Sequence, residues 1–252
     1  MYGRRGRIGL LVPGGNSVME PEFHRMAPDG VSTHANRVFL KDVTPESLAG
    51  MADHAAESAR GLAPVRIGVL AFGCTSGSFI GGKGYDAELI RIMEQAAGVP
   101  ATTTTTAVLR ALELLGVRRL ALVTPYTEEV TGLEARFLED HGFEVTRALG
   151  GGLVEVADMQ ECEPEVAYAR AREVDTDRAE AVFISCTGFR TIEIIEKLEA
   201  ELGKPVISSN QASLADCLRK LGVAEVRPGF GSLFEHVFAA MRPGERAAPA
   251  QG

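Results

Sequence analysis

Two cysteines are the residues in this 252-residue chain whose type and setting point most directly to chemistry. Cys74 ends one apolar run and is followed by Thr75, and Cys186 ends a second apolar run and is followed by Thr187. Each pattern is typical of a buried strand that ends in a tight polar turn. We expect a helix to start just after each cysteine, where the helix dipole would lower the pKa of the thiol.

The two cysteines occupy matching places in an internal repeat. The shift of 112 residues that carries Cys74 onto Cys186 also carries the apolar run at 7–13 onto the run at 119–125. Further along, a shift of 105 residues aligns two copies of a frame made of Gly-x-Pro, a strand, hydroxyl residues and a helix. Three correspondences in the same order predict two similar halves related by an approximate two-fold axis.

Apolar runs alternate with helical patterns along the whole chain. Strands are predicted at 7–12, 31–40, 66–72, 118–124, 143–149, 181–185 and 205–208, with a strand end that passes into a helix at 102–106. Helices are predicted at 44–60, 85–97, 107–115, 127–141, 164–174, 191–202, 212–221 and 232–241. Such alternation predicts an α/β fold of two pseudo-symmetric, Rossmann-like halves, each with a parallel sheet flanked by helices. Ligand sites of parallel sheets lie at the carboxyl ends of strands, so we expect the active site in the cleft between the halves.

Composition excludes several classes of partner. The 26 basic and 34 acidic residues give a net charge of −8, which argues against nucleic-acid binding. No apolar run approaches the roughly 20 residues that span a bilayer, and no signal peptide is evident, so we expect a cytoplasmic protein that does not bind membranes. The four cysteines form no CxxC pair and are interpreted as free thiols.

No cofactor or metal is expected. The glycine-rich stretch at 77–84 nearly matches a phosphate-binding loop, but glycine stands where the motif needs Ser or Thr after Lys83. Glu20, Glu22 and His24 have no partner cluster and are assigned to a solvated face or local structure. The loop at 150–163 begins with three glycines and is interpreted as a lid.

Two thiols facing each other across one cleft allow two reactions. One thiolate could remove a proton from one face of a carbon while the other thiol delivers a proton to the opposite face, which is racemisation. Alternatively, a thiolate could add to an activated C=C bond and leave after rotation, which is cis–trans isomerisation without a cofactor. Both routes pass through an enolate-like carboxylate, which Thr75, Ser76 and Thr187 could stabilise with hydroxyl and backbone donors.

The chain is similar to the aspartate/glutamate racemase superfamily, in the branch of maleate cis–trans isomerases and arylmalonate decarboxylases. The stretches that carry this resemblance are Val12–Glu20, Gly73–Ser76, Thr106–Leu109, Gly116–Arg119, Ser185–Gly188, Ser208–Ala212 and Arg227–Gly231. Maleate isomerases carry two cysteines, an asparagine and a tyrosine like those of this chain, whereas decarboxylases have glycine at the position of Cys74. The residues after Cys74, Thr-Ser-Gly-Ser-Phe, are more similar to the decarboxylase branch.

The resemblance implies a site, a division into halves and a reaction class. The predicted catalytic residues are Cys74 and Cys186, and the predicted substrate-binding residues are Asn16, Thr75, Ser76, Tyr126, Thr187, Gly188 and Asn210. The first half is expected at 1–106 plus 213–241 and the second at 107–212, with a disordered tail at 242–252. Members of the family are often oligomeric, so a homo-oligomer is one expected state.

The leading hypothesis is a cofactor-independent isomerase, of maleate-isomerase or racemase type, acting on a small carboxylate or dicarboxylate. One alternative is an arylmalonate-type decarboxylase that uses Cys186 alone as proton donor. The other is a non-catalytic protein that binds a dicarboxylate or an ectoine breakdown product.

Overall fold

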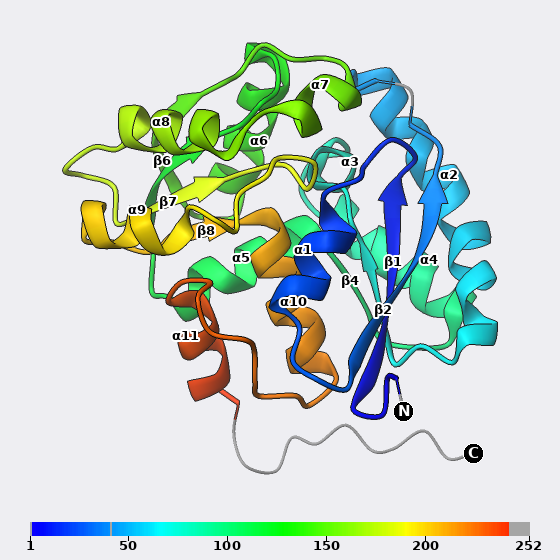
Figure 1. The fold of residues 1–252 in the computed structure, drawn as a ribbon. Helices are drawn as coiled ribbons and strands as arrows, with labels where there is room; N and C mark the ends of the chain where they lie inside the picture. Colours follow the sequence, from blue (N-terminus) through cyan, green and yellow to red (C-terminus); the bar gives the residue numbers. More distant parts are fainter. Residues whose placement is uncertain (1, 41, 242–252) are drawn as a thin grey trace.

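Two four-stranded parallel sheets form the framework of the computed structural model, which describes residues 2–40 and 42–241 (Figure 1). The first sheet has the order β2-β1-β3-β4, from β1 (Gly6–Pro13), β2 (Val31–Val38), β3 (Val69–Phe72) and β4 (Ala101–Thr103). The second has the order β6-β5-β7-β8, from β5 (Arg119–Val123), β6 (Glu144–Leu149), β7 (Ala181–Ile184) and β8 (Val206–Ser208). The predicted α/β fold with two parallel sheets is confirmed.

The internal repeat is visible in the backbone. Strand β7 begins and ends 112 residues after β3, and β8 begins and ends 105 residues after β4. The strand register repeats as well, since Ile8 lies opposite Val69 and Leu120 lies opposite Ala181. The two offsets found in the sequence therefore correspond to one supersecondary unit used twice.

Helices connect and cover the strands. Their bounds are α1 (Met19–Met26), α2 (Pro45–Leu62), α3 (Thr75–Phe79), α4 (Tyr85–Ala97), α5 (Thr104–Leu114), α6 (Glu128–Asp140), α7 (Val156–Glu161), α8 (Pro164–Val174), α9 (Ile195–Leu202), α10 (Ser209–Lys220) and α11 (Leu233–Ala239). A 3₁₀ turn follows α2 at Ala63–Val65.

Several predicted bounds need correction. The sequence analysis missed α1, gave no bounds for the helix that it expected after Cys74, which is α3, and interpreted the segment that contains α7 as loop alone. Helix α9 begins at Ile195 and not at Thr191. The tail predicted at 242–252 lies outside the described residues, and the boundaries predicted for the two halves stay a prediction.

Helices α5 and α10 join the two halves at the centre of the molecule (Figure 1). They pack against each other, and α10 also contacts β3, β4 and β8. The two helices begin alike, because the Thr103 hydroxyl accepts the Thr106 N–H and the Ser208 hydroxyl accepts the Gln211 N–H. This shared joint brings strand ends of both sheets to one region.

The central strands are buried on both faces. Every residue of β3 and β7 is buried, as expected for parallel strands with helices on either side. Among the described residues, no helix is long and apolar enough to cross a membrane.

Candidate active site

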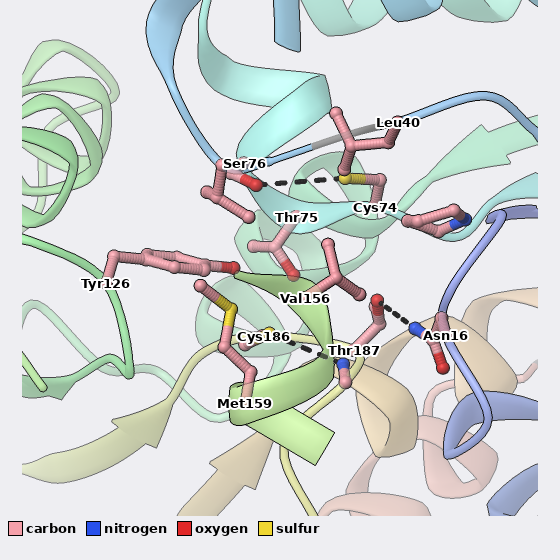
Figure 2. Close-up of a pocket in the computed structure, with 13 residues that line it drawn as sticks. Asn16, Leu40, Cys74, Thr75, Ser76, Tyr126, Val156, Met159, Cys186 and Thr187 are labelled. Carbon is pink, nitrogen blue, oxygen red and sulfur yellow. Dashed lines mark hydrogen bonds between the residues drawn. The ribbon is translucent and has the colours of Figure 1, made fainter. Parts of the chain in front are cut away.

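A cavity of about 300 Å³ lies where the carboxyl ends of strands from the two sheets meet (Figure 2). The residues that line it are Pro13, Asn16, Leu40, Val43, Cys74, Thr75, Ser76, Tyr126, Val156, Met159, Cys186, Thr187 and Gly188. The structure thus brings together all the predicted site residues except Asn210. In Figure 2, Cys74 and Cys186 approach the cavity from opposite sides.

Cys74 lies at the N-cap of α3, as the sequence analysis expected for this cysteine. Its Sγ accepts the Gly77 N–H at 3.3 Å and lies 3.7 Å from the Ser76 Oγ. Burial raises the pKa of the Cys74 thiol to about 11, while these two hydrogen bonds lower it. The thiol is therefore neutral near pH 7, next to donors that would stabilise a thiolate.

Cys186 has a different backbone, and the expectation that a helix follows it was wrong. It adopts a φ of 97°, in the left-handed region that residues other than glycine rarely enter, and irregular chain follows it as far as α9. Its Sγ accepts the Gly188 N–H at 3.3 Å. Burial raises the pKa of the Cys186 thiol to about 12, and a hydrogen bond from Tyr126 lowers it.

Thr187 ties the two halves together. Its Oγ1 accepts a hydrogen bond from Asn16 Nδ2 at 3.0 Å and donates one to the Gly73 carbonyl at 3.0 Å. The single hydroxyl proton of Thr187 is therefore used inside the protein, so its side chain is not the donor into the cavity that the sequence analysis expected. The bonds that Asn16 Oδ1 accepts from the backbone N–H groups of Val18 and Met19 fix the orientation of the amide. Of the two protons on Nδ2, one goes to Thr187 and the other remains.

Ser209 bridges the two cysteine turns and was not predicted as a site residue. Its Oγ accepts the Cys186 N–H at 3.1 Å and lies 2.9 Å from the Thr75 Oγ1. If the Ser209 proton goes to Thr75, the Thr75 proton is free to point into the cavity. The only sequence signal was the pair of hydroxyl residues at the start of the second copy of the repeated frame.

The cavity has a polar side and an apolar side. Hydroxyl groups of Thr75, Ser76 and Tyr126 lie on the polar side, and burial raises the pKa of Tyr126 well above its ordinary value, which keeps the phenol neutral and able to donate. The apolar side is formed by Leu40, Val43, Val156 and Met159. Among the described residues, the lining contains no Lys, Arg or His, and no group of three metal-binding side chains occurs.

The apolar side comes from two segments that close over the strand ends. One precedes α2 and the other leads into α7, and they are joined where the Val43 N–H donates to the Val154 carbonyl at 3.0 Å. The Ser17 hydroxyl donates to Gln160 Oε1 at 2.7 Å and so fixes α7 to the loop after β1. Two residues of the segment at 150–163, Val156 and Met159, therefore line the cavity, and its action as a lid stays a prediction.

Asn210 lies behind the cavity rather than in its lining. Its Nδ2 donates to Glu22 Oε2 at 2.7 Å and to the Thr187 carbonyl at 3.1 Å. Both protons of the amide are therefore used, so Asn210 has none to offer a carboxylate in the cavity. Glu22, assigned in the sequence analysis to a solvated face or local structure, is buried with only 4% of its surface exposed.

Comparison with known proteins identifies relatives along nearly the whole chain. The profile of the arylmalonate decarboxylase family matches residues 8–234. The arylmalonate decarboxylase of Bordetella bronchiseptica is 34% identical, over 90% of this chain and 96% of that protein. The maleate isomerase of Nocardia farcinica is 32% identical, over 90% of this chain and 94% of that protein.

Solved structures of both enzymes share the fold. A Nocardia farcinica maleate cis–trans isomerase mutant with a covalently bound succinylcysteine intermediate superimposes with a TM-score of 0.86, at 26% identity, covering 91% of this chain and 98% of that one. A liganded arylmalonate decarboxylase, with glycine changed to cysteine and cysteine to serine, superimposes with a TM-score of 0.85, at 34% identity, covering 91% and 99%.

Proposed function

The chain belongs to the family of arylmalonate decarboxylases and maleate isomerases, within the Asp/Glu racemase superfamily, and on this premise we propose that it is a cofactor-independent isomerase that uses Cys74 and Cys186 as opposed acid and base. The observation that carries the proposal is the placement of two thiols on opposite sides of one cavity (Figure 2). A decarboxylase of this family needs one thiol, whereas inversion at a carbon needs a proton group on each face.

Racemisation at a carbon next to a carboxylate fits the lining best. We assign Cys74, which lies at the N-cap of α3, as the base: its thiolate removes the α-proton, and the C–H electrons move into the carboxylate to form a planar enediolate. The Cys186 thiol then gives its proton to the opposite face. The turnover ends with a Cys74 thiol and a Cys186 thiolate, and a substrate of the opposite hand restores the starting state.

The hydroxyl side of the cavity would hold the enediolate. The Thr75 hydroxyl proton and the spare amide proton of Asn16 can donate to the two oxygens on which charge develops, and the Ser76 proton can turn to them once Cys74 has taken up the α-proton. Such preorganised donors in a site shielded from water stabilise the intermediate more than they stabilise the less charged oxygens of the ground state.

The substrate would carry one carboxylate and one apolar substituent. Among the described residues, the side of the cavity formed by Leu40, Val43, Val156 and Met159 offers no donor to a second carboxylate. This favours an α-substituted monocarboxylate over a dicarboxylate such as the maleate that a Pseudomonas putida isomerase was crystallised with.

Deuterium exchange tests the proposal. The protein is incubated in D₂O with single enantiomers of α-substituted carboxylates, and separately with maleate, aryl malonates, hydantoins and amino acids. The reactions are followed by NMR and chiral chromatography. We expect wild type to invert an enantiomer with incorporation of deuterium, and Cys74→Ala and Cys186→Ala each to lose inversion. Cys162→Ser, a thiol outside the cavity lining, is the matched control. Full turnover by both alanine variants would refute the proposal, and saturable binding without deuterium uptake would favour a binding protein.

Decarboxylation of an aryl malonate is the second candidate, favoured by the apolar side of the cavity and by the family profile. Loss of CO₂ leaves the same enediolate, which Cys186 alone can protonate. On this reading Cys74→Gly keeps or raises the rate of CO₂ release, and loss of all activity in that variant would count against it.

A further inference from the structure

A buried carboxylate holds the chain that follows Cys186, and the proposed reaction gives it no part. Glu22, on α1, accepts the Thr191 N–H at 2.9 Å and the Ile192 N–H at 3.4 Å through Oε1. Its Oε2 accepts from Asn210 Nδ2 at 2.7 Å. All three bonds cross between segments more than 160 residues apart in sequence, at separations of 169, 170 and 188 residues.

The second proton of Asn210 extends this contact to the cysteine turn. Asn210 Nδ2 donates to the Thr187 carbonyl at 3.1 Å, and Thr187 directly follows Cys186. The backbone of Cys186 is strained, with a φ of 97°, so its conformation must be imposed by the surroundings. Glu22 and Asn210 are part of what imposes it, from the side opposite the cavity.

We propose that Glu22, in its ionised form, is a positioning residue that holds the Cys186–Gly188 turn in the conformation in which the Cys186 thiol reacts. The inference rests on the proposed function only in taking Cys186 as a reacting group.

The hydrogen bonds select the ionised form. A carboxylate only accepts, and both oxygens of Glu22 meet donors. A proton on Oε2 would face an N–H of Asn210, and the amide could accept that proton only by turning its Oδ1 toward Glu22. Asn210 Oδ1 is buried without a hydrogen-bond partner, so an acceptor is available for that turn. The turned amide would point Nδ2 away from Thr187, whose carbonyl would lose its donor.

The pKa of Glu22 places this change near neutral pH. Burial raises it to about 7, against the lowering effect of the hydrogen bonds from Thr191, Asn210 and Ile192. Glu193 is the charged neighbour that acts on Glu22, and it raises the pKa further while pairing with Arg25 of α1. From α10 the facing group is the neutral Asn210. The carboxylate and its hold on the turn are therefore present above about pH 7 and lost below it.

The test compares the two thiols of one protein. Full-length wild type and Glu22→Gln are treated with iodoacetamide between about pH 6 and pH 8, and alkylation of Cys186 and Cys74 is followed by peptide mass spectrometry. Both thiols titrate well above this range, so each rate rises tenfold per pH unit and their ratio stays constant unless the Cys186 turn changes. We expect the Cys186:Cys74 ratio in wild type to rise about fivefold across pH 7, the factor that one intramolecular hydrogen bond carries.

Glu22→Gln should hold the ratio at its low value at every pH, because the glutamine amide forces the same turn of Asn210. Glu193→Gln, which removes a neighbouring charge but no bond to Asn210, should keep the rise with a slightly lower midpoint. Thermal unfolding at pH 8 supplies the second readout: Glu22→Gln should unfold at an unchanged or higher temperature, since an ionised buried carboxylate opposes folding, whereas a purely structural role lowers it.

A ratio that stays flat in wild type would overturn the inference even if Glu22→Gln failed to fold, and so would a Glu22→Gln ratio that follows wild type. Because alkylation needs no substrate, its outcome is independent of the deuterium-exchange experiment. Failure of the proposed reaction and failure of this inference are therefore distinguishable.

Discussion

Removing the Thr187 hydroxyl should loosen the contact that joins the two cysteine turns. Thr187 Oγ1 lies 3.0 Å from Asn16 Nδ2 and 3.0 Å from the Gly73 carbonyl, and both Asn16 and Thr187 are buried. Thr187→Val keeps the shape of the side chain and deletes only this bonding. Asn16 and Gly73 follow strands of the first sheet, whereas Thr187 follows a strand of the second sheet. The change therefore acts on both halves of the site.

The expected loss of stability in Thr187→Val follows from the polar groups that lose their hydrogen-bond partner. Each hydrogen bond contributes about 1 kcal/mol net, and a buried group left without a partner costs about 1–3 kcal/mol. Thr187→Val leaves one N–H of Asn16 and the carbonyl of the buried Gly73 without their hydrogen-bond partner. We therefore expect a loss of about 2–4 kcal/mol in the free energy of unfolding.

Thr187→Ser is the matched control, because it keeps the hydroxyl and removes one methyl group, worth about 1 kcal/mol. Urea unfolding of the three proteins at one pH gives the comparison, and a double-mutant cycle with Asn16→Ala isolates the Asn16–Thr187 bond. Turnover should fall with the contact, since a shift of about 1 Å in a reacting group can cost about 100-fold in rate. A Thr187→Val protein within about 0.5 kcal/mol of Thr187→Ser would refute the reasoning.

Four further predictions follow from the site and its surroundings. Ser209→Ala should lower turnover on the true substrate more than it lowers stability, because it frees both the Thr75 hydroxyl and the Cys186 N–H; equal activity in both proteins would contradict this. Burial raises the pKa of Glu134 from 4.5 to about 8, so folding takes up a proton between these values and wild type should lose stability as pH rises through that window. Glu134→Gln should remove the part of that loss that Glu134 causes, leaving the part due to Glu22, and should be more stable by about 2–4 kcal/mol at pH 8, as measured by urea unfolding; no gain would contradict the assignment. Met159→Ala should shift preference toward carboxylates with bulkier apolar substituents, measured as ratios of kcat/KM, and an unchanged ratio would place the substituent elsewhere. Alkylation of Cys74 should keep rising about tenfold per unit up to about pH 10, and a plateau near pH 8 would show that its pKa is not about 11.

The repeat is the part of the fold that the sequence predicted best. Strands β3 and β7 are buried on both faces, so each is visible in the sequence as an uninterrupted apolar run. The offset between Cys74 and Cys186 equals the offset between these strands. Each cysteine lies two residues after the end of its strand, and both line the same cavity. The local sequence was sufficient to predict both features here, because each buried strand and its cysteine lie on the same short segment.

The bounds of the shortest helices were not predicted, because such short segments have no periodic pattern of apolar residues. Helix α3 is five residues of Thr-Ser-Gly-Ser-Phe, too short and too polar to show an apolar stripe, yet it places Cys74 at a helix N-cap. At Cys186 the same Cys-Thr pattern is followed by irregular chain, because Thr191 and Ile192 are bonded to Glu22 instead of starting a helix. Whether a helix follows the cysteine therefore depends here on a contact with a residue in the first half of the chain. The sequence around Cys186 does not reveal that contact.

The polar residues behind the site were misjudged for the same reason. Glu22 was assigned to a solvated face or local structure, and Asn210 was assigned to a substrate carboxylate, whereas the two side chains bond each other across 188 residues. Sequence spacing shows which residues can share a strand end. It does not show which polar side chains use up their hydrogen bonds on one another before a ligand arrives.

The repeat and its departures together argue for a direction of proton transfer. Symmetry of the sheets brings one thiol to each side of the cavity, and if the backbones were also alike neither thiol would be preferred as the base. They are not alike: Cys74 sits in relaxed extended backbone at an N-cap, while Cys186 is held at a φ of 97° by contacts from Ser209 and from the segment that Glu22 binds. Burial raises the pKa of both thiols, but only Cys74 lies at a helix N-cap, where the Gly77 N–H and the helix dipole favour a thiolate. An enantiomer whose α-proton faces Cys74 should therefore exchange that proton faster than its mirror image, and Cys74→Ser should reduce that preference more than Cys186→Ser does.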